Sequence, residues 1–468
     1  MNMDNYNNYK IIVVGAGIAG CEAAIVCAKM GLKTLIINIS MDNPAMLKYN
    51  SKLGGTYNDI LLNEIKILNG FIPKAILINK IAESNENNRN MAKSYIIDKR
   101  NFSLFYKYYM ETLNNLETRQ GLVVNIEECN LNEDIRYKVI LNDNSVFFTK
   151  SIIITTGTFL DANIIWGKNR INAGRHGEIN SISFDKNLKN IGYEFEKIKT
   201  YISPGIDRKT INLKKLKKIK SVMQGDSDID NLKQFKNFKK NNIKEKYFAF
   251  KTVASIENLK KTVKYIYKNH KSSFNDGGNS LNNNTDKLIE NSGTFNKNNE
   301  IEITLYTEGA NTIVLYADGF KSILSEEKQQ LLLNQFLGLE NSSITKPGYC
   351  IEYDSLKRSQ IKINLESKIH ENIFFAGEVN GIFSYEEIVS EGLIAGINAS
   401  LKIYKDKEFI INKEDSLIGF FIYSLFNKKI NDLKISYSEK ENFIKTYEIN
   451  DVKNKLLNYL KAINKYFL

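Results

Sequence analysis

Three glycines near the amino terminus have the spacing of a nucleotide-binding turn. The segment Tyr9–Glu22 reads YKIIVVGAGIAGCE and places Gly15, Gly17 and Gly20 in the pattern G-x-G-x-x-G. In such a turn the first glycine permits a tight bend and the second lets backbone approach a pyrophosphate, while the third lets helix and strand pack closely. The free N–H groups at the start of the helix would face the phosphates. These residues therefore predict a dinucleotide-binding site.

A strand, a helix and a second strand must hold this turn. The apolar run Ile11 to Val14 predicts a buried parallel strand, Ile18 to Met30 a helix, and Lys33 to Ile37 the second strand. Asn38 stands near the end of the second strand, where the usual residue is an acid. An amide can hydrogen-bond ribose hydroxyls but carries no charge that rejects a 2′-phosphate. The turn alone therefore does not choose between FAD and NAD.

Bulk properties indicate a globular protein of two or three domains. The chain has 468 residues, of which 43% are hydrophobic and 25% charged. The longest apolar run, Leu417 to Phe426, is too short to span a bilayer, and the polar amino terminus lacks a signal-peptide core. Four cysteines without a CxxC pair indicate a reducing compartment, and the three histidines are scattered. We expect a cytoplasmic chain with no membrane segment, no metal site and no Ser-His-Asp set.

The charge of the chain allows an RNA-binding surface. The net charge is +12, from 65 basic and 53 acidic residues, and lysines are dense at 214–218 and 236–246. The alternative is a solvated face, because the whole sequence is rich in Lys, Asn and Ile. The lysines predicted to contact RNA are Lys214, Lys215, Lys217, Lys218, Lys236, Lys239 and Lys240.

The order of the remaining patterns predicts a two-domain flavoprotein of the α/β class. A strand ending at Gly157 and a late Ala376-Gly377-Glu378 turn join the first glycine turn, and the composition changes between them. The Asn-, Gly- and Ser-rich run 271–300 predicts disorder or poor packing. Further helices are expected at 56–69, 101–115, 326–337, 386–403 and 450–467. We expect an FAD-binding Rossmann-type, glutathione-reductase-like domain built from both ends of the chain (1–200 and 346–404), an inserted α+β substrate or nicotinamide domain (201–345) and a short helical tail (405–468).

Several segments match longer motifs in a consistent order. They are Val13–Ala24 (VVGAGIAGCEAA), Thr155–Leu160 (TTGTFL), Ala173–Gly177 (AGRHG), Pro347–Asp354 (PGYCIEYD), Phe374–Gly381 (FFAGEVNG), Tyr385–Glu387 (YEE) and Gly392–Ala399 (GLIAGINA). Over most of its length the chain resembles the GidA/MnmG family, FAD-dependent proteins that modify the wobble uridine of tRNA. The resemblance implies the same fold and FAD as the cofactor.

The resemblance also implies individual FAD contacts. The turn would hold the pyrophosphate, Val123 would contact FAD from a strand, and Ser181 would do so just after the AGRHG segment. Glu378 stands where the family has Gln beside the isoalloxazine. An anion there would disfavour the reduced flavin anion and change its potential; the alternative is a solvated or protonated carboxyl that replaces the amide. The cofactor residues so implied are Gly15, Ala16, Gly17, Ile18, Ala19, Gly20, Val123, Ser181, Gly377 and Glu378.

The two functional cysteines of the family have no counterpart in this sequence. For the first, alignment without gaps from Lys33 to Gly55 puts Tyr49 at the position, whereas matching on Asn43-Pro-Ala45 puts Asp42 there. The second belongs to a segment that also contributes to NAD binding, and the Asn-rich run replaces it. The catalytic residues are therefore unassigned, and we expect reduction by a nicotinamide to be weak or absent.

The chain's own cysteines offer one candidate replacement. Cys21 and Cys27 lie in the first predicted helix and are expected in the core, and Cys129 has no evident role. Cys350 lies within the PGYCIEYD segment, where the family usually has Ala. It would need a strongly lowered pKa to act as a nucleophile.

We expect an FAD-dependent enzyme of C5 modification of the tRNA wobble uridine, with reduced folate and NAD(P)H as further reactants. One alternative is a folate- and FAD-dependent RNA uracil methyltransferase, and another is a degenerate paralogue that keeps FAD without catalysis. Transfer RNA is the expected partner. The family's long C-terminal helical part, used for tRNA and for a partner GTPase, has no counterpart here, so the GTPase is not expected to bind. The sequence is compatible with a homodimer but does not determine the oligomeric state.

Overall fold

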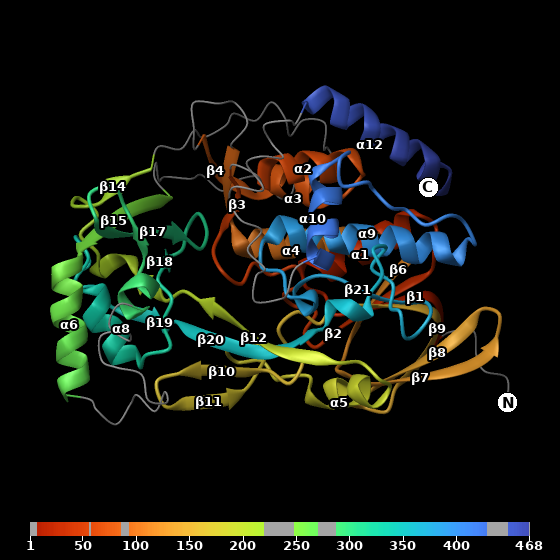
Figure 1. The fold of residues 1–468 in the computed structure, drawn as a ribbon, viewed down its shortest axis with the longest axis horizontal. Coiled ribbons are helices and arrows are strands. Elements are labelled where there is room, and N and C mark those ends of the chain that lie inside the picture. Colours follow the sequence, from red (N-terminus) through yellow and green to blue (C-terminus); the bar gives the residue numbers. More distant parts are fainter. Residues whose placement is uncertain are drawn as a thin grey trace.

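The computed structural model describes residues 7–55, 58–85, 93–219, 248–269, 287–427 and 448–467. A larger body contains both ends of the described chain, and long strands connect it to a smaller body formed by the middle of the chain (Figure 1). The predicted lysine cluster at 236–246 lies outside the described residues.

Parallel strands form the centre of the larger body. Their hydrogen-bonded order is β6-β2-β1-β9, with β21 on the other side of β9, which is the order of a Rossmann-type sheet. The antiparallel hairpin of β7 and β8 extends the sheet from the first half of β9. Ile11, Ile12 and Val13 are fully buried because helices cover both faces of such a sheet. The strands are β1 Asn8–Val14, β2 Thr34–Asn38, β6 Leu116–Gln120, β7 Val123–Asn132, β8 Ile135–Leu141, β9 Val146–Ile154 and β21 Ile373–Phe375.

Among the described helices, α1 (Ile18–Lys29) and α9 (Tyr385–Ile403) have the most extensive contact with each other. Small residues permit this approach. A Cβ atom on Gly392 would lie 2.3 Å from the carbonyl oxygen of Ala19, and one on Gly396 would lie 2.4 Å from Val26 Cγ1. The remaining elements of this region are β3 Lys52–Gly54, α2 Asn58–Ile67, α3 Ile72–Asn79, β4 Lys80–Asn85, β5 Lys93–Ile97 and α4 Lys99–Glu111.

The described C-terminal part folds back onto the larger body. Helix α10 (Leu417–Asn427) begins on the fully buried Glu64 of α2, whose two carboxylate oxygens accept the N–H groups of Leu417 and Ile418 at 2.8 Å each. This carboxylate satisfies two of the free N–H groups at the helix start. The helix predicted at 450–467 is found as α12 (Ile449–Ile463), which packs on α2.

A four-stranded sheet connects the two bodies. Its order is β11-β10-β20-β12, with all neighbours antiparallel. Strands β12 and β20 pair over their whole length, so segments about 150 residues apart in the sequence run side by side along the lower part of Figure 1. The strands and the adjoining helix are β10 Asn163–Trp166, β11 Asn169–Asn172, α5 Ile182–Asn190, β12 Phe195–Ile202 and β20 Tyr349–Leu356.

The smaller body is an antiparallel sheet backed by α6 (Ile256–Asn269) and α8 (Glu326–Leu333). The prediction of poor packing across 271–300 is wrong for residues 287–300. Ile289 is 3% exposed within the core of this body, and β16 pairs with β17. Sequence composition missed this because one buried Ile and one strand pairing are enough to fix a polar segment. The strands are β13 Gly205–Asp207, β14 Lys217–Lys218, β15 Ala249–Ser255, β16 Thr294–Phe295, β17 Glu300–Thr307, β18 Val314–Asp318 and β19 Ile344–Lys346.

Among the described residues, no helix combines the length and the apolar character needed to cross a membrane.

Candidate functional site

The three glycine turns meet at one edge of the parallel sheet. The loops that follow β1, β9 and β21 all leave the carboxyl ends of their strands, where open α/β sheets bind ligands. A cavity lies along this edge. It is lined by residues from the three turns and from the ends of β2 and β6, including Val14 to Ala19, Ile37 to Ile39, Gly121 to Val123, Thr155 to Phe159 and Glu378.

The glycines of the first turn have different roles. Gly15 has a φ of +104°, and a Cβ atom there would lie 2.5 Å from the carbonyl oxygen of Thr155. A Cβ atom on Gly20 would lie 1.9 Å from the carbonyl oxygen of Gly15. The fold itself therefore requires these two glycines. Gly17 has an ordinary φ of −65°, and its Cβ would meet no atom within 4 Å. Close approach of a ligand to the backbone would give a physical reason for a glycine at this position.

The start of α1 leaves its N–H groups available to that ligand. Gly17 is the N-cap, and no side chain donates or accepts a capping hydrogen bond there. The N–H of Ala16 is instead held by Asn38 Oδ1 at 3.0 Å, and Asn38 Nδ2 donates to Ser40 at 2.6 Å. The Asn38 amide, which could hydrogen-bond a ribose, is thus bonded through both its oxygen and its nitrogen within the chain, and it shapes the turn.

Most of the predicted cofactor residues line this cavity. Gly20 and Gly377 are not in the lining; they lie behind it, where Gly377 has a φ of +87° and a Cβ there would come within 2.9 Å of Ala19 Cβ. Sequence reasoning missed other lining residues, among them Lys48, Arg175 and Thr156. The Oγ1 of Thr156 is buried without a hydrogen-bond partner among the described atoms, which a polar ligand could supply. The predicted residues that line the cavity are Gly15, Ala16, Gly17, Ile18, Ala19, Val123, Ser181 and Glu378.

Glu378 is neither solvated nor alone. Its side chain is 11% exposed and forms an ion pair with Lys48, with 2.6 Å between Lys48 Nζ and Glu378 Oε1. The hydroxyl of Tyr49 donates to the same oxygen at 2.5 Å and lies 3.0 Å from Thr200 Oγ1. Burial lowers the pKa of Lys48, and the adjacent carboxylate partly restores it. Burial, together with that carboxylate, raises the pKa of Tyr49 well above its usual value.

The two residues considered for the position of the missing cysteine have different surroundings. Tyr49 contacts Glu378 of the cavity wall, whereas the Asp42 side chain is 81% exposed and lies 3.6 Å from Lys107 Nζ. The candidate thiol is unsuited to nucleophilic chemistry, because burial raises the pKa of Cys350 to about 12. Cys21 and Cys27 are buried in the core as expected.

A second cavity of about 600 Å³ adjoins the first. Tyr385 lines both, and Tyr49 stands between them with its ring centroid 5.6 Å from that of Tyr385. The second cavity lies between the larger body and the smaller one, because its lining residues fall within 49–54, at Asn58, and within 199–203, 318–321 and 383–386. A ligand there would lie next to whatever occupies the first cavity.

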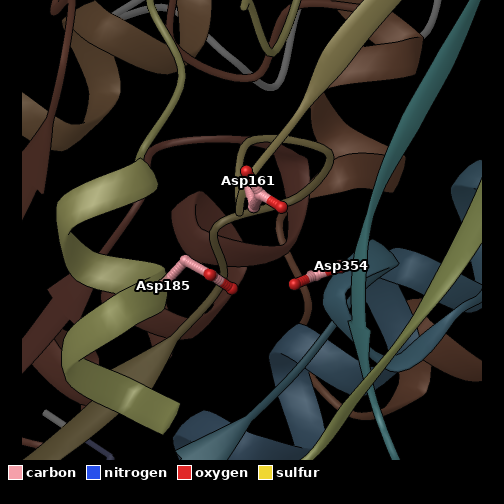
Figure 2. Close-up of side chains that lie close together, drawn as sticks. All are labelled: Asp161, Asp185 and Asp354. Carbon is pink, nitrogen blue, oxygen red and sulfur yellow. The ribbon is translucent and has the colours of Figure 1, made fainter. Parts of the chain in front are cut away.

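Three carboxylates of the described chain lie close enough together to hold a metal ion: Asp161, Asp185 and Asp354 (Figure 2). Two lysines already neutralise them. Lys189 lies 2.7 Å from Asp185 and 2.5 Å from Asp354, and Lys197 lies 2.6 Å from Asp161 and 2.9 Å from Asp354. Burial raises the pKa of Asp185 to about 6, whereas at Asp354 the two lysines outweigh burial and lower the pKa. We interpret the cluster as an ion-pair network that joins α5, β12 and β20.

Lys197→Met is expected to destabilise the fold by about 1–3 kcal/mol, because it leaves the buried Asp354 with a single cation. This loss of stability lies at the low end of the range for buried ion pairs, because the Lys197 side chain is 40% exposed to solvent. The matched control is Lys199→Met on the same strand, which lies 3.4 Å from the more exposed Glu352 and should cost less than about 1 kcal/mol. Urea denaturation measures both, and equal losses would contradict the network.

The sequence is similar to a known protein family over most of its length. The family model described as glucose inhibited division protein A matches residues 10–407. The tRNA uridine 5-carboxymethylaminomethyl modification enzyme MnmG of Finegoldia magna is 31% identical over 439 residues, which cover 91% of this chain and 67% of that protein. The protein of the same name from Alkaliphilus oremlandii is 30% identical over 92% of this chain and 67% of its own.

A solved structure has the same fold. The structure of Aquifex aeolicus GidA in the form II crystal superposes with a TM-score of 0.79 at 24% identity, covering 99% of this chain and 74% of that one. This fold agrees with the sequence motifs and with the Rossmann-type sheet. The family model and the MnmG relatives indicate the same family. The chain therefore belongs to the glucose inhibited division protein A family.

Proposed function

We propose that the chain binds FAD in the cavity at the carboxyl ends of β1, β9 and β21. The observation that carries the proposal is the open space in front of Gly17, at an uncapped helix N-terminus that favours a pyrophosphate. The turn from Gly15 to Ala19 would hold the pyrophosphate, and Val123, Ser181 and Glu378 would line the rest of the cofactor. When bound, FAD would supply redox chemistry that no side chain provides.

We further propose that the chain acts in C5 modification of the wobble uridine of tRNA. Its relatives carry the name tRNA uridine 5-carboxymethylaminomethyl modification enzyme. The second cavity supports this assignment, because it adjoins the proposed flavin site and offers Tyr201, Phe383 and Tyr385 as aromatic walls for a base. Reduced folate would provide the methylene group, and reducing equivalents from NAD(P)H would reach FAD only slowly, because the Asn-rich run replaces the family's nicotinamide segment. Exposed lysines at 214, 217 and 218 offer phosphate contacts beside β15.

A second candidate is FAD binding without catalysis. Two observations favour it. Tyr49, one of the two residues considered for the position of the family's cysteine, keeps its proton, because its hydroxyl is buried and donates to Glu378. Cys350 keeps its proton as well, since its pKa is raised to about 12. Neither group is a nucleophile near neutral pH.

The deciding experiment measures flavin and nucleoside together. We expect the purified protein to show the absorbance of FAD, and we expect it to restore the wobble nucleoside in cells that lack their own GidA/MnmG protein. Cys350→Ala should leave this nucleoside unchanged, because the buried thiol is not reactive. Bound flavin without the nucleoside would favour the second candidate, and a protein without flavin would overturn both.

A further inference from the structure

The wall of the first cavity contains two ion pairs, Arg175 with Glu178 and, more deeply buried, Lys48 with Glu378. Lys48 comes from the loop after β2, and Glu378 comes from the turn after β21, more than 300 residues later. Each side chain is 11% exposed, and their charged atoms lie 2.6 Å apart. Lys48 Nζ also lies 3.5 Å from Thr158 Oγ1, in the turn after β9. The pair therefore bridges loops that surround the cavity.

The position of the Lys48–Glu378 pair along the first cavity indicates which part of a bound flavin it would face. One end of the cavity is formed by residues 37–39 and 121–123, and the glycine turn lies along its wall. Lys48 and Glu378 stand by Tyr385 and Tyr49, where the second cavity begins. A redox-active ring must meet its reaction partner, so it belongs at this end, beside the second cavity, rather than at the end formed by residues 37–39 and 121–123.

We propose that the Lys48–Glu378 pair sets the midpoint potential of the bound flavin. Lys48 cancels the negative charge of Glu378, so that the pair presents no net charge to the flavin ring. The inference rests on the proposed FAD binding. Loss of either partner would leave one uncompensated charge in a buried site, where charges interact strongly. A lone anion opposes the reduced cofactor, which gains negative charge, and a lone cation favours it.

The two single variants therefore have opposite expected effects. In Glu378→Gln the cation of Lys48 remains, and the ratio of affinities for reduced and oxidised FAD should rise about tenfold, which is about 30 mV for two electrons. In Lys48→Met the carboxylate of Glu378 remains, and the ratio should fall by a similar factor. Both substitutions approximately conserve side-chain length, so the shape of the cavity wall is retained.

The experiment is a double-mutant cycle read as flavin midpoint potentials against reference dyes. The combination of Lys48→Met with Glu378→Gln should return the potential close to that of the parent. Lys48→Arg should also keep it, because the positive charge is retained. Lys405→Met, at a side chain 77% exposed, removes the same charge outside the cavity and serves as the control. Flavin content and the unfolding temperature are recorded for every variant.

The outcomes separate this inference from the proposed function. A parent protein without flavin would overturn the proposed function and the inference together. Flavin bound in all variants, with potentials that are equal or that shift in the same direction, would overturn the inference alone. If one single variant fails to fold, the other single variant and the double variant still determine the sign of the effect.

Discussion

Gly17→Val is expected to yield a folded protein that is purified without FAD. The backbone at Gly17 is in a conformation open to any residue, and a Cβ there meets no protein atom within 4 Å. The added side chain would instead fill the space at the helix N-terminus that a pyrophosphate needs. We expect binding to weaken about a hundredfold or more, which corresponds to about 3 kcal/mol. Flavin absorbance after purification and titration with added FAD measure the loss.

Gly20→Val is the matched control. A Cβ at Gly20 would lie 1.9 Å from the carbonyl oxygen of Gly15 and 2.6 Å from Thr155 Oγ1, so the strand and helix must separate. This substitution is expected to lower the free energy of unfolding by about 3 kcal/mol or more. If Gly17→Val keeps stoichiometric flavin, the cavity is not the FAD site. If it unfolds like the Gly20 variant, the glycine serves the fold and the inference from it is wrong.

Lys99→Met is expected to remove a pH dependence of stability between about pH 7 and pH 10. Lys99 is 3% exposed at the start of α4, and its Nζ lies 4.5 Å from the centroid of the Tyr316 ring in the smaller body. Burial lowers the pKa of Lys99 to about 7. In the unfolded chain the pKa of a lysine is about 10.4, so the unfolded state binds one more proton across this range. Stability gained from this group therefore rises with pH, by about 1.4 kcal/mol per unit.

The measurement compares parent and variant rather than one protein alone. The free energy of unfolding of the parent, minus that of Lys99→Met, should increase by about 2–3 kcal/mol from pH 7.5 to pH 9.5. Lys260→Met on the exposed side of α6 should follow the parent at every pH. A constant difference between parent and Lys99→Met would show that the ammonium is not buried between the two bodies.

The local part of the site could be predicted from the sequence. The run Ile11 to Val14 and the glycines that follow it correspond to β1, the turn and α1 in the structure. The small residues between Gly392 and Ala399 predict a helix that packs closely on a neighbour. In the structure this helix is α9, and its neighbour is α1. These patterns are readable because burial repeats with the period of each element, and because glycine at a fixed spacing reports a backbone position that rejects a side chain.

The chemical state of the site depended on the tertiary structure. From the sequence Glu378 could be a free anion, a solvated group or a protonated one, and its partner Lys48 carried no signal of its own. The order of β1, β2, β9 and β21 in the sheet brings their loops together and closes the ion pair. The same assembly placed Tyr49 in contact with Glu378 and left the Asp42 side chain exposed.

Contacts between residues distant in the sequence also determined which carboxylates form ion pairs. The carboxylates of Asp161, Asp185 and Asp354 form one network only because α5, β12 and β20 meet. The sequence determined the elements and the glycine turn, since each arises from residues a few positions apart. The tertiary structure determined charge pairing, burial and hence pKa, because these depend on loops that approach one another only once the sheet order is set.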